Sequence, residues 1–283
     1  MFGAEDAPQL EAWYLWWVGL CAAAALNVAL WFYSARQLGR RTDFPDDVRA
    51  TRRALLGLAA VYTLGCAFRS LLPMIDVPRL CLHDPWIARI VSGRSVATIA
   101  EMAFAAQWAL LVREAGAVRA ARCILPLIGA AEVVSWYAVL TQNDLFHALE
   151  NSIWPLTVVI AVFFLATRWP HESERGRKTI LAAVGSAAMY VAFMVAYVVP
   201  MYLTRWYAGQ THIAAGEGLE QVLARCTVSR DWSLWWQDAA WLTPYFTICV
   251  WMSIALAHTP NLRNSESEHD LRGISSGGRE IVL

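Results

Sequence analysis

The stretch CILPLIGAAEVVSWYAVLTQNDLFHALENSIWPLTVVIAVFFLAT, residues 123–167, determines the fold class. Its outer parts, 123–142 and 151–167, are apolar runs close to the roughly 20 residues that an α-helix needs to cross a hydrocarbon core. The short polar segment NDLFHALE separates them. Two such runs with a short polar connection predict two consecutive membrane-spanning helices.

The same pattern extends along the whole chain of 283 residues. Further apolar runs lie near 13–35, 54–75, 95–113, 179–203 and 237–258. Charged residues make up 16% of the chain and its mean hydropathy is +0.39, whereas a soluble domain carries about 25% charged residues. We therefore predict an all-α polytopic integral membrane protein, a bundle of seven transmembrane helices within residues 1–259. The tail 260–283, rich in Ser, Gly and charge, is predicted to be a disordered cytoplasmic segment.

The distribution of arginines predicts the orientation in the membrane. Most basic residues fall in the segments 36–53, 113–122, 168–178 and 263–279, which alternate with the other connections along the chain. All four segments lie on one side of the membrane, and loops rich in Lys and Arg stay in the cytoplasm. We predict the N-terminus outside and the C-terminus in the cytoplasm.

Charge also limits the partners of this chain. It has 23 basic and 23 acidic residues, so no net charge favours binding to nucleic acid. The expected partners are the lipid bilayer and a small-molecule or lipid ligand. The membrane is either a bacterial inner membrane or a eukaryotic plasma membrane or endomembrane, and the sequence fits each of them.

Two cysteines lie in the longer outer connections, Cys81 in 76–94 and Cys226 in 204–236. An outer compartment is oxidising, so we predict a disulfide between them. The alternative is two unpaired thiols, because the sequence does not show that their Cα atoms approach each other. The six cysteines of the chain have no CxxC spacing, and a zinc framework is not supported.

Ionisable residues within the predicted spans indicate a site, since each costs roughly 2.5–3.5 kcal/mol at the centre of the membrane. Arg69 and Glu101 lie at similar depths, roughly 9 Å below the outer surface. A buried Arg69–Glu101 pair is therefore predicted, either at a ligand site or as a structural ion pair. Glu132 lies near the middle of a run without a basic residue, so it is either neutral and hydrogen bonded or paired with a cation or metal.

A polar stripe begins in the connection quoted above. One helical face carries His147, Glu150, Asn151 and Trp154. A plainer interpretation is that Asn143 or Asn151 caps a helix, with Pro155 in its first turn. Capping does not explain why a histidine and a glutamate stand together.

Other polar faces also point to the outer half of the bundle, whereas the inner halves carry almost no charge. They contain Arg94 with Glu101 in the third run and Asp238 with Trp241 in the seventh. We predict an acidic and aromatic pocket open to the outside. Its lip would carry the polar stripe, and Glu101 and Glu132 would form its floor. The Tyr and Met stripes of the last two runs are interpreted as core.

Three functions fit these residues. The first is a membrane-embedded enzyme acting on a lipid or a small cationic molecule, with four catalytic candidates that would also suit a divalent metal: Glu101, Glu132, His147 and Glu150. The second is a transporter or receptor-like binder of a small cationic solute, with six ligand-binding candidates: Arg69, Arg94, Asn151, Trp154, Asp238 and Trp241. The third is a non-catalytic assembly component whose polar interior only specifies packing.

Known motifs of three families are absent. The seventh run, 237–258, contains no lysine, which the microbial rhodopsins need there. The third run ends in VREAG instead of the D/ERY motif of rhodopsin-like receptors. The ceramidase-like hydrolases bind zinc with three histidines and an aspartate, whereas here His171 and His258 fall on the inner side and His83, His147 and His212 lie in outer connections. The sequence supports none of these families.

Overall fold

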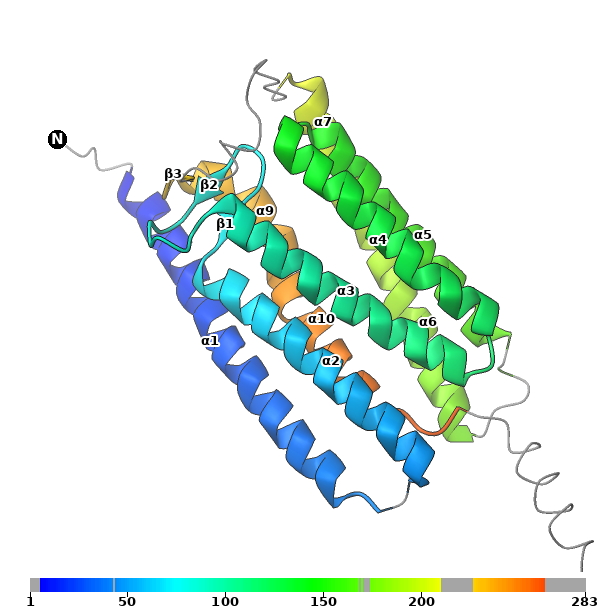
Figure 1. Cartoon of the computed structure of the whole chain (residues 1–283). Helices are drawn as coiled ribbons and strands as arrows, with labels where there is room; N and C mark the ends of the chain where they lie inside the picture. Colours follow the sequence, from blue (N-terminus) through cyan, green and yellow to red (C-terminus); the bar gives the residue numbers. More distant parts are fainter. Residues whose placement is uncertain (1–5, 43, 168, 170–173, 210–225, 263–283) are drawn as a thin grey trace, which may run out of the picture.

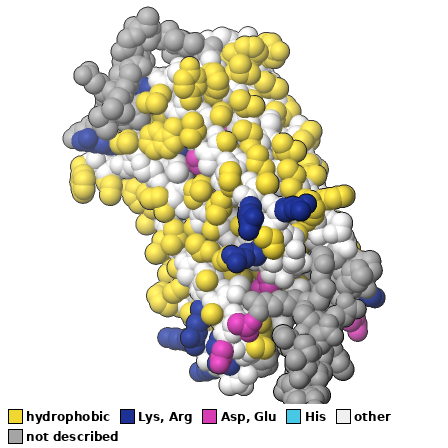
Figure 2. Space-filling model, turned by 45° about the vertical axis from the view of Figure 1, so that its right-hand side comes forward, with side chains coloured by type: hydrophobic (Ala, Val, Ile, Leu, Met, Phe, Trp, Pro, Cys, Tyr) yellow, Lys and Arg dark blue, Asp and Glu magenta, His cyan; other side chains and the backbone are white. Residues whose placement is uncertain are grey.

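A computed structural model describes residues 6–42, 44–167, 169, 174–209 and 226–262, and Figure 1 shows a bundle of long helices with short strands at one end. Within these residues, seven spans are long and apolar enough to cross a membrane. The predicted all-α bundle of seven spans is confirmed. Hydrophobic side chains cover most of the face that Figure 2 leaves free of grey atoms, as lipid contact requires.

The first five spans are single helices, whereas the last two are interrupted. The five are α1 (Asp6–Arg40), α2 (Asp46–Leu71), α3 (Ile90–Glu114), α4 (Val118–Thr141) and α5 (Asp144–Ala166). The sixth combines α6 (Glu174–Phe193), the π-helical segment η2 (Met194–Val198) and α7 (Val199–Tyr207), and the seventh combines α9 (Trp232–Phe246) and α10 (Ile248–Leu256). Pro244 precedes the interruption at Thr247, in agreement with the tendency of proline to break helical hydrogen bonding.

The fifth span begins earlier than the sequence predicted. Asn143 caps α5, since its Oδ1 accepts a hydrogen bond at 3.0 Å from a backbone N–H two residues later. The capping interpretation is confirmed for Asn143, but it is wrong for Asn151 and Pro155, which lie inside the helix. The polar stripe is therefore part of a membrane-spanning helix, and not of a loop at its entrance.

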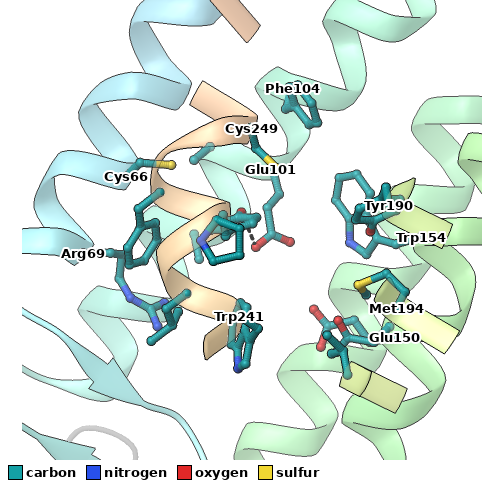
Figure 3. Close-up of a pocket in the computed structure, with 18 of the residues that line it drawn as sticks. Cys66, Arg69, Glu101, Phe104, Glu150, Trp154, Tyr190, Met194, Trp241 and Cys249 are labelled. Atoms are coloured by element: carbon teal, nitrogen blue, oxygen red, sulfur yellow. Dashed lines mark hydrogen bonds between the residues drawn. The ribbon is translucent and has the colours of Figure 1, made fainter. Parts of the chain in front are cut away.

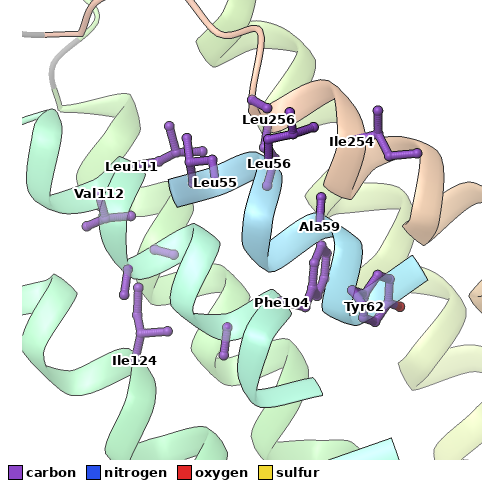
Figure 4. Packing of buried hydrophobic residues seen from close by; sticks show 14 of the residues in the cluster. Leu55, Leu56, Ala59, Tyr62, Phe104, Leu111, Val112, Ile124, Ile254 and Leu256 are labelled. Atoms are coloured by element: carbon purple, nitrogen blue, oxygen red, sulfur yellow. The ribbon is translucent and has the colours of Figure 1, made fainter. Parts of the chain in front are cut away.

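Consecutive helices pack side by side from α1 to α5, and the two interrupted spans take different neighbours. The sixth span packs against α5, whereas α9 and α10 pack mainly against α1 and α2. The largest apolar cluster joins α2, α3, α4 and α10 (Figure 4). In it, the rings of Tyr62 and Phe104 stack with centroids 4.8 Å apart. Gly65 allows α2 to approach α3, because a Cβ there would lie 2.7 Å from the Cβ of Ala100.

A small sheet and a disulfide mark one end of the bundle, here named the disulfide end. Strand β1 (Met74–Ile75) pairs antiparallel with β2 (Leu80–Cys81), which pairs parallel with β3 (Thr227–Val228). The predicted disulfide between Cys81 and Cys226 is present. It joins the two longest connections of the chain directly over the helix ends.

A buried ion pair marks the opposite end, here named the ion-pair end. Arg52 Nη1 and Nη2 bind the two carboxylate oxygens of Glu114 at 2.6 and 2.7 Å, and both side chains are buried. Both residues lie just outside the predicted runs 54–75 and 95–113, because α2 begins earlier and α3 ends later than those runs. Residues 260–262 belong to the predicted tail, yet Leu262 N donates to Glu114 Oε1 at 3.1 Å. The rest of that tail lies outside the described residues.

Candidate functional site in an intramembrane cavity

A cavity of about 410 Å³ lies among α2, α3, α5 and the two interrupted spans. Most of its wall is apolar or aromatic, including Phe104, Trp154 and Trp241. Figure 3 shows Glu101 pointing into this space, with Glu150 and Trp154 on the α5 side. Carboxylates therefore face an otherwise apolar chamber.

One arginine meets four carboxylates at the cavity wall. Arg94 Nη2 lies 2.6 Å from Glu132 Oε2 and 3.4 Å from Glu101 Oε2. Arg94 Nη1 lies 3.7 Å from Glu150 Oε1 and 3.8 Å from Asp76 Oδ2. All five side chains are buried, and the most exposed of them, Glu101, has 11% of its side-chain surface accessible. We name these five residues the Arg94 cluster.

The Arg94 cluster has more acidic than basic groups. A single guanidinium balances the charge of one carboxylate, and uncompensated buried charge is strongly unfavourable. Oxygens of Glu101, Glu132 and Glu150 lie within 4.8 Å of one another. Among the described residues, Glu132 Oε1 has no hydrogen-bond partner. The cluster therefore retains capacity for protons or for a further cation.

Hydrogen bonds from α3 and α4 hold the Glu132 side of the cluster. Thr98 Oγ1 donates to Glu132 Oε2 at 2.7 Å, and Trp136 Nε1 donates to Thr98 Oγ1 at 3.1 Å. Glu132 contacts Arg94 but does not line the cavity itself. Its link to the cavity is Arg94, which lines the wall and donates to Glu132.

On the cavity side, two carboxylates are oriented by neighbouring rings. Tyr245 of α9 donates its hydroxyl to Glu101 Oε1 at 2.9 Å. His147 Nδ1 lies 2.9 Å from Glu150 Oε2, and the imidazole packs against Tyr202 with centroids 5.2 Å apart. The His147–Glu150 contact uses the helical spacing that the sequence showed.

The predicted Arg69–Glu101 pair is wrong. Arg69 Nη1 donates to Gly93 O at 3.3 Å and Nη2 donates to Met74 O at 3.0 Å, so this residue ties α2 to the start of α3 and to β1. Glu101 pairs with Arg94 instead. Position along a span does not show the direction in which a side chain points around its helix, and that direction separates Arg69 from Glu101.

The two interrupted spans are joined near the disulfide end. Arg205 of α7 forms a salt bridge with Asp238 of α9 at 2.5 Å, and Trp241 Nε1 donates to Asp238 Oδ1 at 3.3 Å. Tyr197 donates its hydroxyl to the backbone oxygen of Gln237 at 3.0 Å. Asp238 is thus both a cavity residue and part of a clamp between the sixth and seventh spans.

The structure brings most candidate residues of the sequence to one cavity. The wall includes Arg69, Arg94, Glu101, His147, Glu150, Asn151, Trp154, Asp238 and Trp241. Sequence reasoning missed Asp76, which lies in a connection, and gave too little weight to Tyr245 and Met194, which it interpreted as core. Tyr245 shares a helical face with Asp238 and Trp241, and that alignment could have identified it.

The sequence analysis predicted a pocket that opens at the end where the polar residues lie, which is the disulfide end, whereas the structure covers the cavity there. Of the lining residues there, Met74, Val77 and Tyr202 are buried, so β1 and the residues after it cover the cavity. Sequence patterns placed the polar groups near this end but contained no information about the connection that folds over them.

In comparisons with known proteins, no family model, no curated protein and no solved structure matches the chain.

Proposed function

We propose that this multi-pass membrane protein binds, within its intramembrane cavity, a small molecule that carries a cationic group such as an amine or a quaternary ammonium. The observation that carries the proposal is the Arg94 cluster, in which four buried carboxylates meet one guanidinium. A bound cation would compensate part of the remaining negative charge.

The rest of the cavity supports a cation with an apolar body. Its volume of about 410 Å³ falls in the range of about 300–1,000 Å³ that is usual for small-molecule sites. Trp154, Tyr190 and Trp241 line it together with Glu101 and Glu150. Aromatic faces attract cations most strongly where water is excluded.

A metal-dependent membrane enzyme is the second candidate. The oxygens of Glu101, Glu132 and Glu150 within 4.8 Å of one another favour it, since hard divalent cations prefer carboxylate ligands. Arg94 weighs against it, because its Nη2 lies 2.6 Å from one of these carboxylates and 3.4 Å from another. The guanidinium already supplies positive charge where a metal would bind, so we favour an organic cation in the adjoining chamber.

We further propose that the disulfide end faces the outside and the ion-pair end faces the cytoplasm. The arginine-rich segments 36–53 and 113–122 belong to the ion-pair end, in accordance with the positive-inside rule. A protease-cleavable tag added after residue 283 should be cut only in inside-out vesicles. Cleavage in right-side-out vesicles would show the opposite orientation.

Thermal unfolding in a non-ionic detergent tests the ligand class. Tetramethylammonium and dodecyltrimethylammonium serve as cationic probes, laurate serves as an anionic control, and metal content is measured on the same preparation. We expect at least one cation to raise Tm and Glu150→Gln to weaken its apparent affinity at least about tenfold, equivalent to about 1.4 kcal/mol. Glu174→Gln is the matched control, because Glu174 is exposed on α6 and pairs with Lys178.

Three results oppose the proposal. An equal response to laurate would show that charge does not select the ligand. A stoichiometric divalent metal, lost in Glu101→Gln, would favour the enzyme. A Tm change in Glu150→Gln without any response to either cation would favour an assembly component whose polar interior only specifies packing.

A further inference from the structure

Within the part of the chain that the structure describes, the exposed margin of the cavity lies between the sixth and seventh spans. Among the described lining residues, Met189 of α6 and Ile248 of α10 are the two exposed ones, at 65% and 51% of their surface. The remaining lining residues are buried or half-buried. Side chains that both line a cavity and reach the outer surface define its mouth, here named the lateral mouth.

The lateral mouth lies at the depth of the hydrocarbon core. Met189 is about 27 Å along the helical path from the end of α7, and Ile248 is about 24 Å from the start of α9, at 1.5 Å per residue. Both helix ends belong to the disulfide end, and the hydrocarbon core is about 30 Å thick. The mouth therefore opens toward lipid chains and not toward water.

Contacts between the interrupted spans explain why a mouth forms at this level. The Arg205–Asp238 salt bridge holds the two spans together near the disulfide end. Deeper in the bundle, α6 packs against α5, whereas α10 packs against α2 and α1. The π-helical segment η2 and the interruption at Thr247 separate the joined parts from the diverging parts. The two irregularities thus border the opening.

The interior changes character between the Arg94 cluster and the lateral mouth. Glu150 lies about 9 Å from the start of α5, so the mouth is roughly 15 Å deeper along the bundle. The wall between them is built from apolar and aromatic groups: Phe104, Trp154, Tyr190, Met194, Cys249 and Met252. A small hydrophilic cation bound at the carboxylates would make no contact with this apolar part of the wall.

We infer that the ligand is a cationic amphiphile that enters from the bilayer, with its charged group at Glu101 and Glu150 and its hydrocarbon chain leaving through the lateral mouth. This inference rests on the proposed function and specifies its ligand class. The charged group faces carboxylates, the chain contacts apolar wall, and its end stays in lipid. The amphiphile is either a free single-chain amine or the choline or ethanolamine part of a phospholipid.

The test compares probes with and without a chain on variants that narrow the lateral mouth. Apparent affinities are measured by thermal shift for tetramethylammonium, dodecyltrimethylammonium and lysophosphatidylcholine. Met189→Trp adds bulk at the mouth. Leu181→Trp is the matched control, because Leu181 is 60% exposed on the same helix and does not line the cavity.

We expect Met189→Trp to lower the apparent affinity for dodecyltrimethylammonium at least about fivefold. Extra bulk in a packed site costs at least about 1 kcal/mol, which corresponds to a change of about this size. Tetramethylammonium affinity should not change, and Leu181→Trp should affect neither probe. If Met189→Trp does not fold, Ile248→Trp places the same bulk on the opposite side of the mouth. Lysophosphatidylcholine binding would identify a phospholipid source, and binding of dodecyltrimethylammonium without lysophosphatidylcholine would identify a free single-chain amphiphile.

Different results would contradict the lateral mouth and the proposed function. The lateral mouth would be contradicted if dodecyltrimethylammonium bound no more tightly than tetramethylammonium and neither Met189→Trp nor Ile248→Trp changed its affinity. The proposed function would still hold if tetramethylammonium binding depended on Glu150. Absence of any Glu150-dependent response to either cation would overturn both.

Discussion

Arg52 at the ion-pair end and Arg94 at the cavity are both buried guanidinium groups, but their surroundings differ. Arg52 binds both oxygens of one carboxylate, Glu114, and donates to the backbone oxygens of Thr259 and Pro260 at 2.9 and 2.7 Å. Arg94 contacts four carboxylates at distances from 2.6 to 3.8 Å. The first arrangement is balanced in charge and hydrogen bonds, and the second is not.

The contrast separates a structural ion pair from a candidate binding site. A balanced buried pair determines which helices meet, and both of its charges are already compensated within the fold. In the Arg94 cluster, four carboxylates meet one guanidinium, and Asp76, Glu101 and Glu150 line the cavity. An excess of buried carboxylates beside a cavity therefore distinguishes a candidate binding site from a structural ion pair.

The largest expected effect comes from breaking the balanced pair. Arg52→Met leaves Glu114 buried without a counter-ion, so the free energy of unfolding should fall by about 3–5 kcal/mol. Titration with a denaturing detergent in mixed micelles measures it. Arg53→Met is the control, because Arg53 is the exposed neighbour on α2. Equal stability of the two variants would show that the pair contributes no more than a surface charge.

Removing the disulfide should act on the cavity end alone. Cys81→Ala combined with Cys226→Ala is expected to cost about 2–4 kcal/mol. Hydrogen exchange should become faster at Met74–Val77, which covers the cavity, and should stay unchanged around Arg52. Cys123→Ala is the control, since Cys123 is an exposed free cysteine. Faster exchange at both ends would mean that the two regions are not independent.

Neutralising one acid of the unbalanced cluster should cost little. Glu132→Gln leaves Arg94 with three carboxylates and retains an oxygen that can accept from Thr98, so the loss should stay below about 1 kcal/mol. Glu114→Gln removes the carboxylate that pairs with Arg52 among the described residues and should cost about 3 kcal/mol. The same detergent titration compares them. A loss in Glu132→Gln as large as that in Glu114→Gln would mean that the Arg94 cluster is balanced after all.

A small pH dependence should arise at the ion-pair end. Burial, and to a lesser degree Arg41, lower the pKa of His258, whose Nε2 lies 2.6 Å from Ser34 Oγ. The unfolded chain then binds this proton more tightly, so stability is complete above about pH 6.5 and decreases as the pH falls toward the lower pKa of the folded state. Tm measured at about pH 7.5 and about pH 5.5 should decrease less in His258→Gln than in the unaltered chain. An unchanged decrease would assign the pH dependence to other groups.

Interhelical polar contacts were partly readable from the sequence. Asn27 was not needed to predict the bundle, yet its Nδ2 donates to Phe246 O at 2.7 Å, as an isolated amide within a span indicates. Gln107 likewise donates to Leu55 O at 2.7 Å. By contrast, Arg52 lies in what the pattern assigned to a cytoplasmic connection, and nothing in the sequence placed Glu114 opposite it. Local composition shows that a polar group must find a partner, but not which one.

By itself, the sequence determined the number of spans, the positions of the carboxylates along them and the helical face shared by His147 and Glu150. These follow from composition and spacing, which act over short distances along the chain. The tertiary structure decided that Glu101 pairs with Arg94 and not with Arg69, that β1 covers the cavity and that the interrupted spans diverge at Met189 and Ile248. Such contacts depend on how each helix is rotated and which neighbour it takes, and packing sets both only when the whole bundle has formed.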